Sequence, residues 1–251
     1  ILGPTPESGK NLSVYVYAAR SGYEQQAAQH NLPGKMTTGF YTPVDPEGVH
    51  LPLAKTRGVH PYFTLVHEGL HQYAHEKLSY KLEQSTDEAP VKLSPLPLWL
   101  NEGLALYVEG AVRNPTSLQP GRIHPSRLSH LQQLLRRDNA PPVKEVINKS
   151  YGEPFTNADY SVSWGVVQFL REAPVERYSW APFWQSLQAE LQKHAALKGK
   201  ELATLDPISR QRKWVEIMTL QSSQTFQQQV LADGLSWDKW EANLQAYILR
   251  L

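Results

Sequence analysis

Two histidines and a glutamate in the segment HEGLH, residues 67–71, have the types and spacing of a metal site. On a helix, His67 and His71 lie on one face about 6 Å apart along the axis, so both imidazoles can bind one zinc ion. Glu68 lies about 100° further round the helix, where it can contact a metal-bound water rather than the metal. The pattern H-E-x-x-H therefore predicts two zinc ligands and a general base.

A catalytic zinc ion needs a third protein ligand and an open position for water. The chain has no cysteine, so this ligand must be His, Asp or Glu. Glu102 is the candidate, because it is flanked by leucines and a tryptophan, and a buried carboxylate without a partner would be costly there. His75 continues the row of histidines, but it lies about 12 Å along the helix from His67. We expect it at the surface or beside the ligands.

The segments HEGLH and LWLNEGLALY resemble those of the gluzincin zinc metallopeptidases, in particular a bacterial family of gluzincin-like domains of unassigned substrate. The resemblance implies that His67, His71 and Glu102 hold one Zn²⁺ and that Glu68 polarises the water. The metzincin arrangement fails, because Lys77 stands where its third histidine would be. Leu106 replaces an aspartate of the thermolysin-like enzymes, so the partners of the ligands must differ.

The segment NADYSVSWGVVQFL resembles the gluzincin helix whose tyrosine stabilises the tetrahedral oxyanion, and Tyr160 is the matching position. Tyr107 is a weaker rival for this role. Asp159 and Glu109 could orient the ligand imidazoles as hydrogen-bond acceptors. In gluzincins, an edge strand before the histidine helix pairs with the substrate backbone, and the resemblance assigns this part to residues 48–54.

The resemblance predicts zinc-dependent hydrolysis of peptide bonds in a peptide or protein substrate. The alternative is a non-catalytic metal-binding module that recognises peptide or glycan. A helical domain with a fortuitous motif would require both HEGLH and NEGLA to be accidents. Free-amine recognition, which an aminopeptidase requires, has no identifiable residue.

Charge and hydropathy exclude several other classes of function. The net charge of +1 gives no electrostatic argument for nucleic acid or an anionic membrane. No apolar run approaches the 18 residues or so of a transmembrane helix. The lack of cysteine fits a periplasmic or extracellular protein, and it fits many cytosolic proteins too. The resemblance favours an exported protein, periplasmic or extracellular, whose signal is not in this sequence. We expect a monomer.

The elements that must position these residues follow from hydrophobic periodicity. The first sixty residues read as strands and turns, with strands at 12–19, 37–43 and 48–54. A helix is predicted from Pro61 to about Tyr80, then a polar loop at 83–95 and a second helix from Pro97. Further helices are predicted at 126–137, 158–172, 176–194, 207–220, 223–232 and 237–250, with Asn157, Ser222 and Ser236 as caps.

The predicted fold class is α+β and predominantly helical, with a small N-terminal sheet, the HExxH helix and a helical C-terminal body. We expect one metallopeptidase-like domain over 1–251, in which 1–112 carry the sheet and the metal-site helices and 113–251 form a helical lobe.

Overall fold

The computed structural model describes residues 13–32, 37–43, 46–53, 61–82, 91–94, 96–110, 112–114, 117–119, 122–174, 177–231 and 234–251. The chain divides into two compact units, Ile1–Ser79 and Tyr80–Leu251. The predicted division after residue 112 therefore falls inside the second unit. Helices predominate and the largest sheet has three strands, which confirms the predicted fold class.

The first unit is built on a sheet of three short strands, β1 (Val14–Tyr17), β2 (Phe40–Thr42) and β3 (Gly48–Pro52). Their order is β1-β3-β2, so β3 is the central strand. It pairs in parallel with β1, where Tyr15 lies opposite His50, and antiparallel with β2, where Phe40 lies opposite His50. All three strands were predicted from the sequence.

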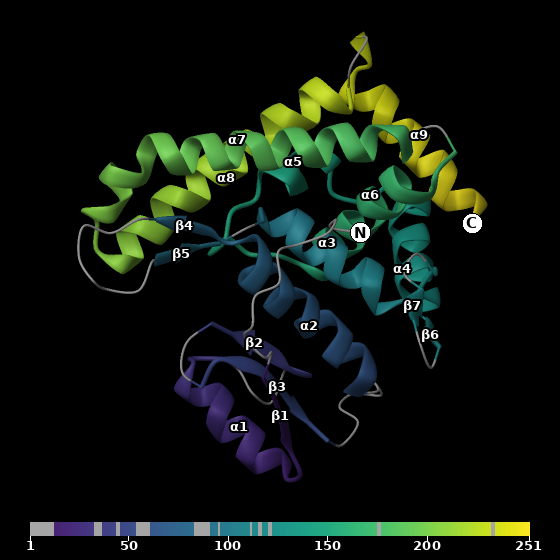
Figure 1. Cartoon of the computed structure of the whole chain (residues 1–251). Coiled ribbons are helices and arrows are strands. Elements are labelled where there is room, and N and C mark those ends of the chain that lie inside the picture. The colour runs from purple at the N-terminus through teal and green to yellow at the C-terminus, as the bar shows by residue number, and fades with distance from the viewer. Residues whose placement is uncertain are drawn as a thin grey trace. The chain divides into compact units, whose positions relative to one another are not determined.

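Helix α1 (Arg20–Gln29) was not predicted, because the sequence before residue 60 read as strands and turns. Its composition is polar, and only Tyr23 and Ala27, one turn apart, are buried. A pair this small gives no helical periodicity in the sequence. The two residues pack with Phe40 into a small core on one face of the sheet, and α2 lies on the other face (Figure 1).

Helix α2 (Pro61–Leu78) begins at the predicted proline and ends close to the predicted end. It packs against β2 and β3. Close approach depends on Gly39, because a Cβ there would lie 2.4 Å from Cγ2 of Thr64 on α2. At the other end of the sheet, Nε2 of Gln72 donates to the carbonyl of Ser13 at 3.1 Å. These contacts fix how α2 lies on the sheet.

The second unit has two hairpins and seven helices among its described residues (Figure 1). The hairpins pair β4 (Tyr80–Leu82) with β5 (Val91–Leu93) and β6 (Val112–Asn114) with β7 (Ser117–Gln119). The helices are α3 (Leu98–Glu109), α4 (Pro125–Arg136), α5 (Val143–Asn148), α6 (Asn157–Glu172), α7 (Arg177–Ala203), α8 (Pro207–Gln229) and α9 (Trp237–Arg250). The predicted polar loop at 83–95 is wrong at β5, and its residues 83–90 lie outside the described part.

Helices α3 and α6 form the centre of the second unit, with ten of the twelve residues of α3 and eleven of the sixteen of α6 buried. Tryptophans pack the surrounding helices: Trp180 stacks on Trp184 with ring centroids 5.9 Å apart, and Trp237 and Trp240 both contact Phe226.

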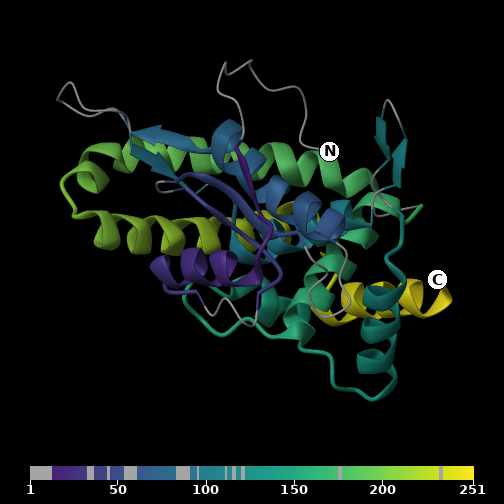
Figure 2. The same cartoon turned by 90° about the horizontal axis from the view of Figure 1, so that it is seen from below.

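Helices α7 and α8 lie side by side in both views (Figures 1 and 2). The sequence predicted a shorter α7 and divided α8 in two, with Ser222 as a cap between the halves. Instead, Ser222 is buried within the continuous α8, where its Oγ accepts a hydrogen bond of 2.9 Å from Nε1 of Trp99. Because Ser222 interrupts the apolar pattern, the sequence predicted a helix end at this position.

The helix caps differ in one other place. Thr156, not Asn157, caps α6, and its side chain and that of Asp159 form a reciprocal capping box. Ser236 caps α9 as predicted. None of the described helices is long and apolar enough to cross a membrane.

Candidate metal centre

His67 and His71 lie one turn apart on the uninterrupted helix α2, as predicted. Their ring centroids are 4.9 Å apart and the ring planes are at 83° to each other. Both residues are partly exposed. Imidazoles at this separation can bind a single metal ion through one nitrogen each, which is the arrangement that the spacing predicts.

Glu68 lies between the two histidines in sequence and faces β2. Its Oε2 accepts a hydrogen bond of 2.9 Å from the backbone N–H of Tyr41. Because the N–H bonds a side chain of α2, it points to the outer side of β2 rather than to β3. A backbone donor to one carboxylate oxygen restricts the rotamer of Glu68.

The predicted substrate strand, residues 48–54, is not an edge strand. Within it, β3 pairs on one side with β1 and on the other with β2. Both sides of its backbone are therefore occupied, and a peptide cannot add to it. The outer strands of this sheet are β1 and β2, and β2 is the one whose backbone contacts Glu68.

His75 lies in the last turn of α2, with its ring 5.8 Å from that of Tyr41. Together with Glu47 and Glu76 it forms a group that could hold a metal ion, since one ligand atom from each lies within 4.8 Å of the others. No sequence motif indicates this group, because Glu47 lies far from His75 and Glu76 along the chain.

Glu102 lies in α3 of the second unit, and the neighbouring Gly103 lets α6 approach α3 closely. A Cβ on Gly103 would lie 2.6 Å from the carbonyl oxygen of Ser163 on α6. Tyr160 precedes Ser163 by about one turn of α6. The glycine of the NEG segment therefore lets α6 pack directly on α3 beside the candidate ligand.

Tyr151, in the turn after α5, joins Glu102 and Tyr160 in an electrostatic cluster within the second unit. Its hydroxyl donates to the carbonyl of Leu96 at 3.2 Å. Although the residue is 36% exposed, burial of its hydroxyl end raises the pKa of Tyr151, and the negative charge of Glu102 raises it further. Tyr151 was not predicted as a site residue, and its only sequence signal is its place beside Gly152 in a turn.

The remaining candidates have structural roles in the second unit. Tyr107 is buried and its hydroxyl donates to Glu172, which disfavours it as the oxyanion donor. Oδ2 of Asp159 accepts from Nζ of Lys149 at 2.8 Å and from the backbone N–H of Thr156 at 2.6 Å. Glu109 lies 3.9 Å from the His124 ring nitrogen. Asp159 and Glu109 therefore have partners other than the predicted ligands.

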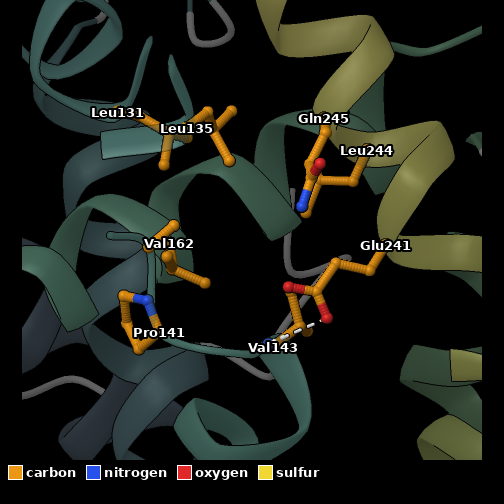
Figure 3. Close-up of a pocket in the computed structure, with 9 residues that line it drawn as sticks. Leu131, Leu135, Pro141, Val143, Val162, Glu241, Leu244 and Gln245 are labelled. Atoms are coloured by element: carbon orange, nitrogen blue, oxygen red, sulfur yellow. Dashed lines mark hydrogen bonds between the residues drawn. The ribbon is translucent and has the colours of Figure 1, made fainter. Parts of the chain in front are cut away.

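A cavity in the second unit is too small to be a ligand site. It lies between α4, α5, α6 and α9, and its lining is apolar except for Glu241 and Gln245 (Figure 3). Its volume of about 10 Å³ is enough for roughly one water molecule. Oε2 of Glu241 accepts a hydrogen bond of 3.3 Å from the backbone N–H of Val143, the first residue of α5. The Glu241 carboxylate thus binds the first backbone N–H of α5 rather than a ligand.

The candidate residues form two groups. His67, Glu68 and His71 lie together on α2, and Glu102, Tyr151 and Tyr160 interact in the second unit. As a donor set, two imidazoles and one carboxylate fit zinc, which takes nitrogen and oxygen ligands in catalytic sites and keeps one position for water.

Comparisons with protein-family models, with curated proteins and with solved structures found no match for this chain.

Proposed function

We propose that the protein is a zinc-dependent peptidase of the gluzincin type, in which His67, His71 and Glu102 bind one Zn²⁺. His67 and His71 come from the first unit and Glu102 comes from the second. The proposal therefore requires both units for full zinc affinity. The substrate is a peptide or a protein.

The observation that carries the proposal is the placement of Glu68. Its carboxylate follows directly after one candidate ligand on α2, and the Tyr41 N–H holds it at 2.9 Å. A general base needs a fixed position within hydrogen-bond distance of the water that it deprotonates. A solvent-exposed glutamate on an ordinary helix face has no need of a backbone donor from a neighbouring strand.

Zn²⁺ held by His67, His71 and Glu102 would supply a Lewis acid for the attacking water and the peptide carbonyl. Glu68 would act as the general base, which accepts a proton from the attacking water on Oε1 and passes it to the leaving amine. Tyr160 donates its phenolic O–H to the developing oxyanion. Because the phenol donates without losing its proton, a tyrosine can fill this role at neutral pH.

A substrate backbone can bind along the outer side of β2. In an antiparallel pair, the N–H and C=O of one residue point to the same side. The Tyr41 carbonyl therefore faces the same side as the N–H that bonds Glu68, and it can accept a hydrogen bond from a peptide N–H. Binding by strand addition depends more on an extended backbone than on particular side chains.

The test combines metal analysis with digestion of a broad peptide library. Glu68→Gln should retain the zinc of the parent protein and lose turnover by about 10²–10⁴-fold. Glu102→Gln should lose zinc affinity as His71→Ala does. Full activity of Glu68→Gln would exclude this mechanism. Zinc binding and peptide binding without any cleavage by the parent protein would indicate a non-catalytic recognition module instead.

A further inference from the structure

A second cluster of metal-ligating side chains lies in the first unit, and two of its three residues follow the HEGLH segment by one turn on α2. Glu47 precedes β3, and His75 and Glu76 lie in the last turn of α2. One nitrogen or oxygen atom from each lies within 4.8 Å of the other two, and all three residues are partly exposed. The cluster joins the start of the central strand to the end of the helix.

The types of these side chains favour a divalent cation. One imidazole nitrogen and two carboxylate oxygens neutralise the charge of a divalent ion, and this mixed set suits zinc. Two ligand atoms on one Zn²⁺ are at most about 4 Å apart. Rotation of the long glutamate side chains can bring the three atoms to that separation.

The surroundings of the cluster also favour a cation. Glu76 lies near the C-terminal end of α2, where the helix dipole disfavours a negative charge and favours a positive one. The buried Tyr41 hydroxyl lies beside Glu47. A phenol O–H in this position can hydrogen-bond to a ligand of the ion.

We propose that Glu47, His75 and Glu76 form a second metal site, which takes a divalent ion of the zinc class with water completing the coordination. This inference does not rest on the proposed peptidase function. The site has a structural role, because its ion joins the turn before β3 to the end of α2 next to Tyr41. Because the backbone of Tyr41 bonds Glu68, the ion also fixes the strand that orients Glu68.

The first experiment counts zinc. The parent protein and two double variants are each saturated with ZnCl₂ and passed through gel filtration. The zinc that remains bound to each protein is then measured. We expect two equivalents in the parent protein. His67→Ala with His71→Ala should leave one equivalent, and His75→Ala with Glu76→Gln should also leave one. A pair on α7, Glu190→Gln with His194→Ala, removes the same chemical groups elsewhere and should leave two.

The outcomes separate this inference from the proposed function. If only the cluster of Glu47, His75 and Glu76 binds zinc, the parent protein holds one equivalent. His75→Ala with Glu76→Gln then abolishes this binding, and His67→Ala with His71→Ala leaves it unchanged. If the His75 pair changes nothing, the second site is excluded, whatever the peptidase assay shows. The same holds if calcium at equal concentration displaces the zinc fully, since an imidazole ligand disfavours calcium.

The second experiment measures where the ion acts. In the His67→Ala, His71→Ala background, zinc should slow amide hydrogen exchange in 40–52 and 70–78. All seven tryptophans lie in the second unit, so their fluorescence should show no zinc-dependent shift in unfolding. Uniform protection of both units, or none, would contradict a local site.

Discussion

The backbone N–H of Tyr41 on β2 donates a hydrogen bond of 2.9 Å to the Oε2 atom of Glu68 on α2. This contact joins residues 27 positions apart in the chain, and Gly39 makes it possible by letting β2 lie against Thr64. A strand of only three residues thus positions the proposed base, through a group that every non-proline residue has.

Tyr41→Pro tests this contact, because proline removes the N–H and leaves the carbonyl. The N–H points away from β3, so the strand ladder should survive, as it does for proline in edge strands. We expect turnover to fall about tenfold or more relative to Tyr41→Ala, which lacks the side chain but keeps the N–H. Zinc content of the His67 and His71 site should be equal in both. Equal turnover of the two variants would show that the hydrogen bond does not orient Glu68.

Two glycines beside the candidate ligands predict opposite effects on stability. A Cβ on Gly103 would lie 2.6 Å from a backbone oxygen of α6, so Gly103→Ala should destabilise the second unit by about 1–3 kcal/mol. A Cβ on Gly69 of α2 would meet nothing within 4 Å, so Gly69→Ala should stabilise its helix by about 0.5–1 kcal/mol. Urea unfolding followed by tryptophan fluorescence reports the second unit alone, and far-UV circular dichroism reports both. A shift of the fluorescence transition by Gly69→Ala, or none by Gly103→Ala, would contradict this assignment.

The fold could be predicted from sequence where apolar residues recur with a clear period. The helices that carry His67 and Glu102 have this pattern, and their bounds were close to those observed. The helix α1 has only Tyr23 and Ala27 facing the sheet, so its pattern is too weak to detect. The sequence also could not show which strand is central. The strands β1, β2 and β3 are all short, and their pairing order depends on contacts between distant segments.

The local part of the candidate site could be predicted because it depends on helical spacing alone. His67, Glu68 and His71 are such a case. Tyr151 and Glu47 could not be found in this way, because their partners are distant in sequence and the turns that carry them have no repeating pattern. Tertiary contacts, rather than motifs, bring such residues together.

The ion pair between Asp159 and Lys149 predicts loss of stability in acid. Burial alone would raise the pKa of Asp159, but hydrogen bonds from Lys149 and Thr156 outweigh it and the pKa is lowered. The folded state therefore favours the ionised form. This contribution is present above the unfolded pKa, near 3.8, and is lost as the pH falls through the lower folded value.

Asp159→Asn should cost about 1–3 kcal/mol at pH 7, because it breaks the charged pair and weakens the α6 cap. The difference from the parent protein should shrink as the pH falls below 3.8. Urea unfolding by tryptophan fluorescence at several pH values measures this, since Asp159 lies in the second unit. A difference that stays constant with pH would show that the negative charge contributes nothing.

Glu241 predicts the opposite dependence on pH. Burial at the small cavity raises its pKa, although the Val143 N–H lowers it in part (Figure 3). The folded state therefore holds the proton more tightly than the unfolded state. Its contribution to stability is full below the unfolded pKa, near 4.5, and declines as the pH rises through the folded value.

Glu241→Gln should therefore stabilise the second unit at pH 7, because the neutral amide oxygen still accepts from Val143 and no charge is buried. We expect a rise in Tm of about 2 °C at pH 7 and little change at pH 4. Glu241→Ala is the control: it leaves the first N–H of α5 without this acceptor and enlarges the cavity, so it should destabilise at both pH values. If Glu241→Gln instead lowers the Tm at pH 7, the ionised carboxylate must stabilise the fold through its hydrogen bond to Val143. The argument that its burial is unfavourable would then be wrong.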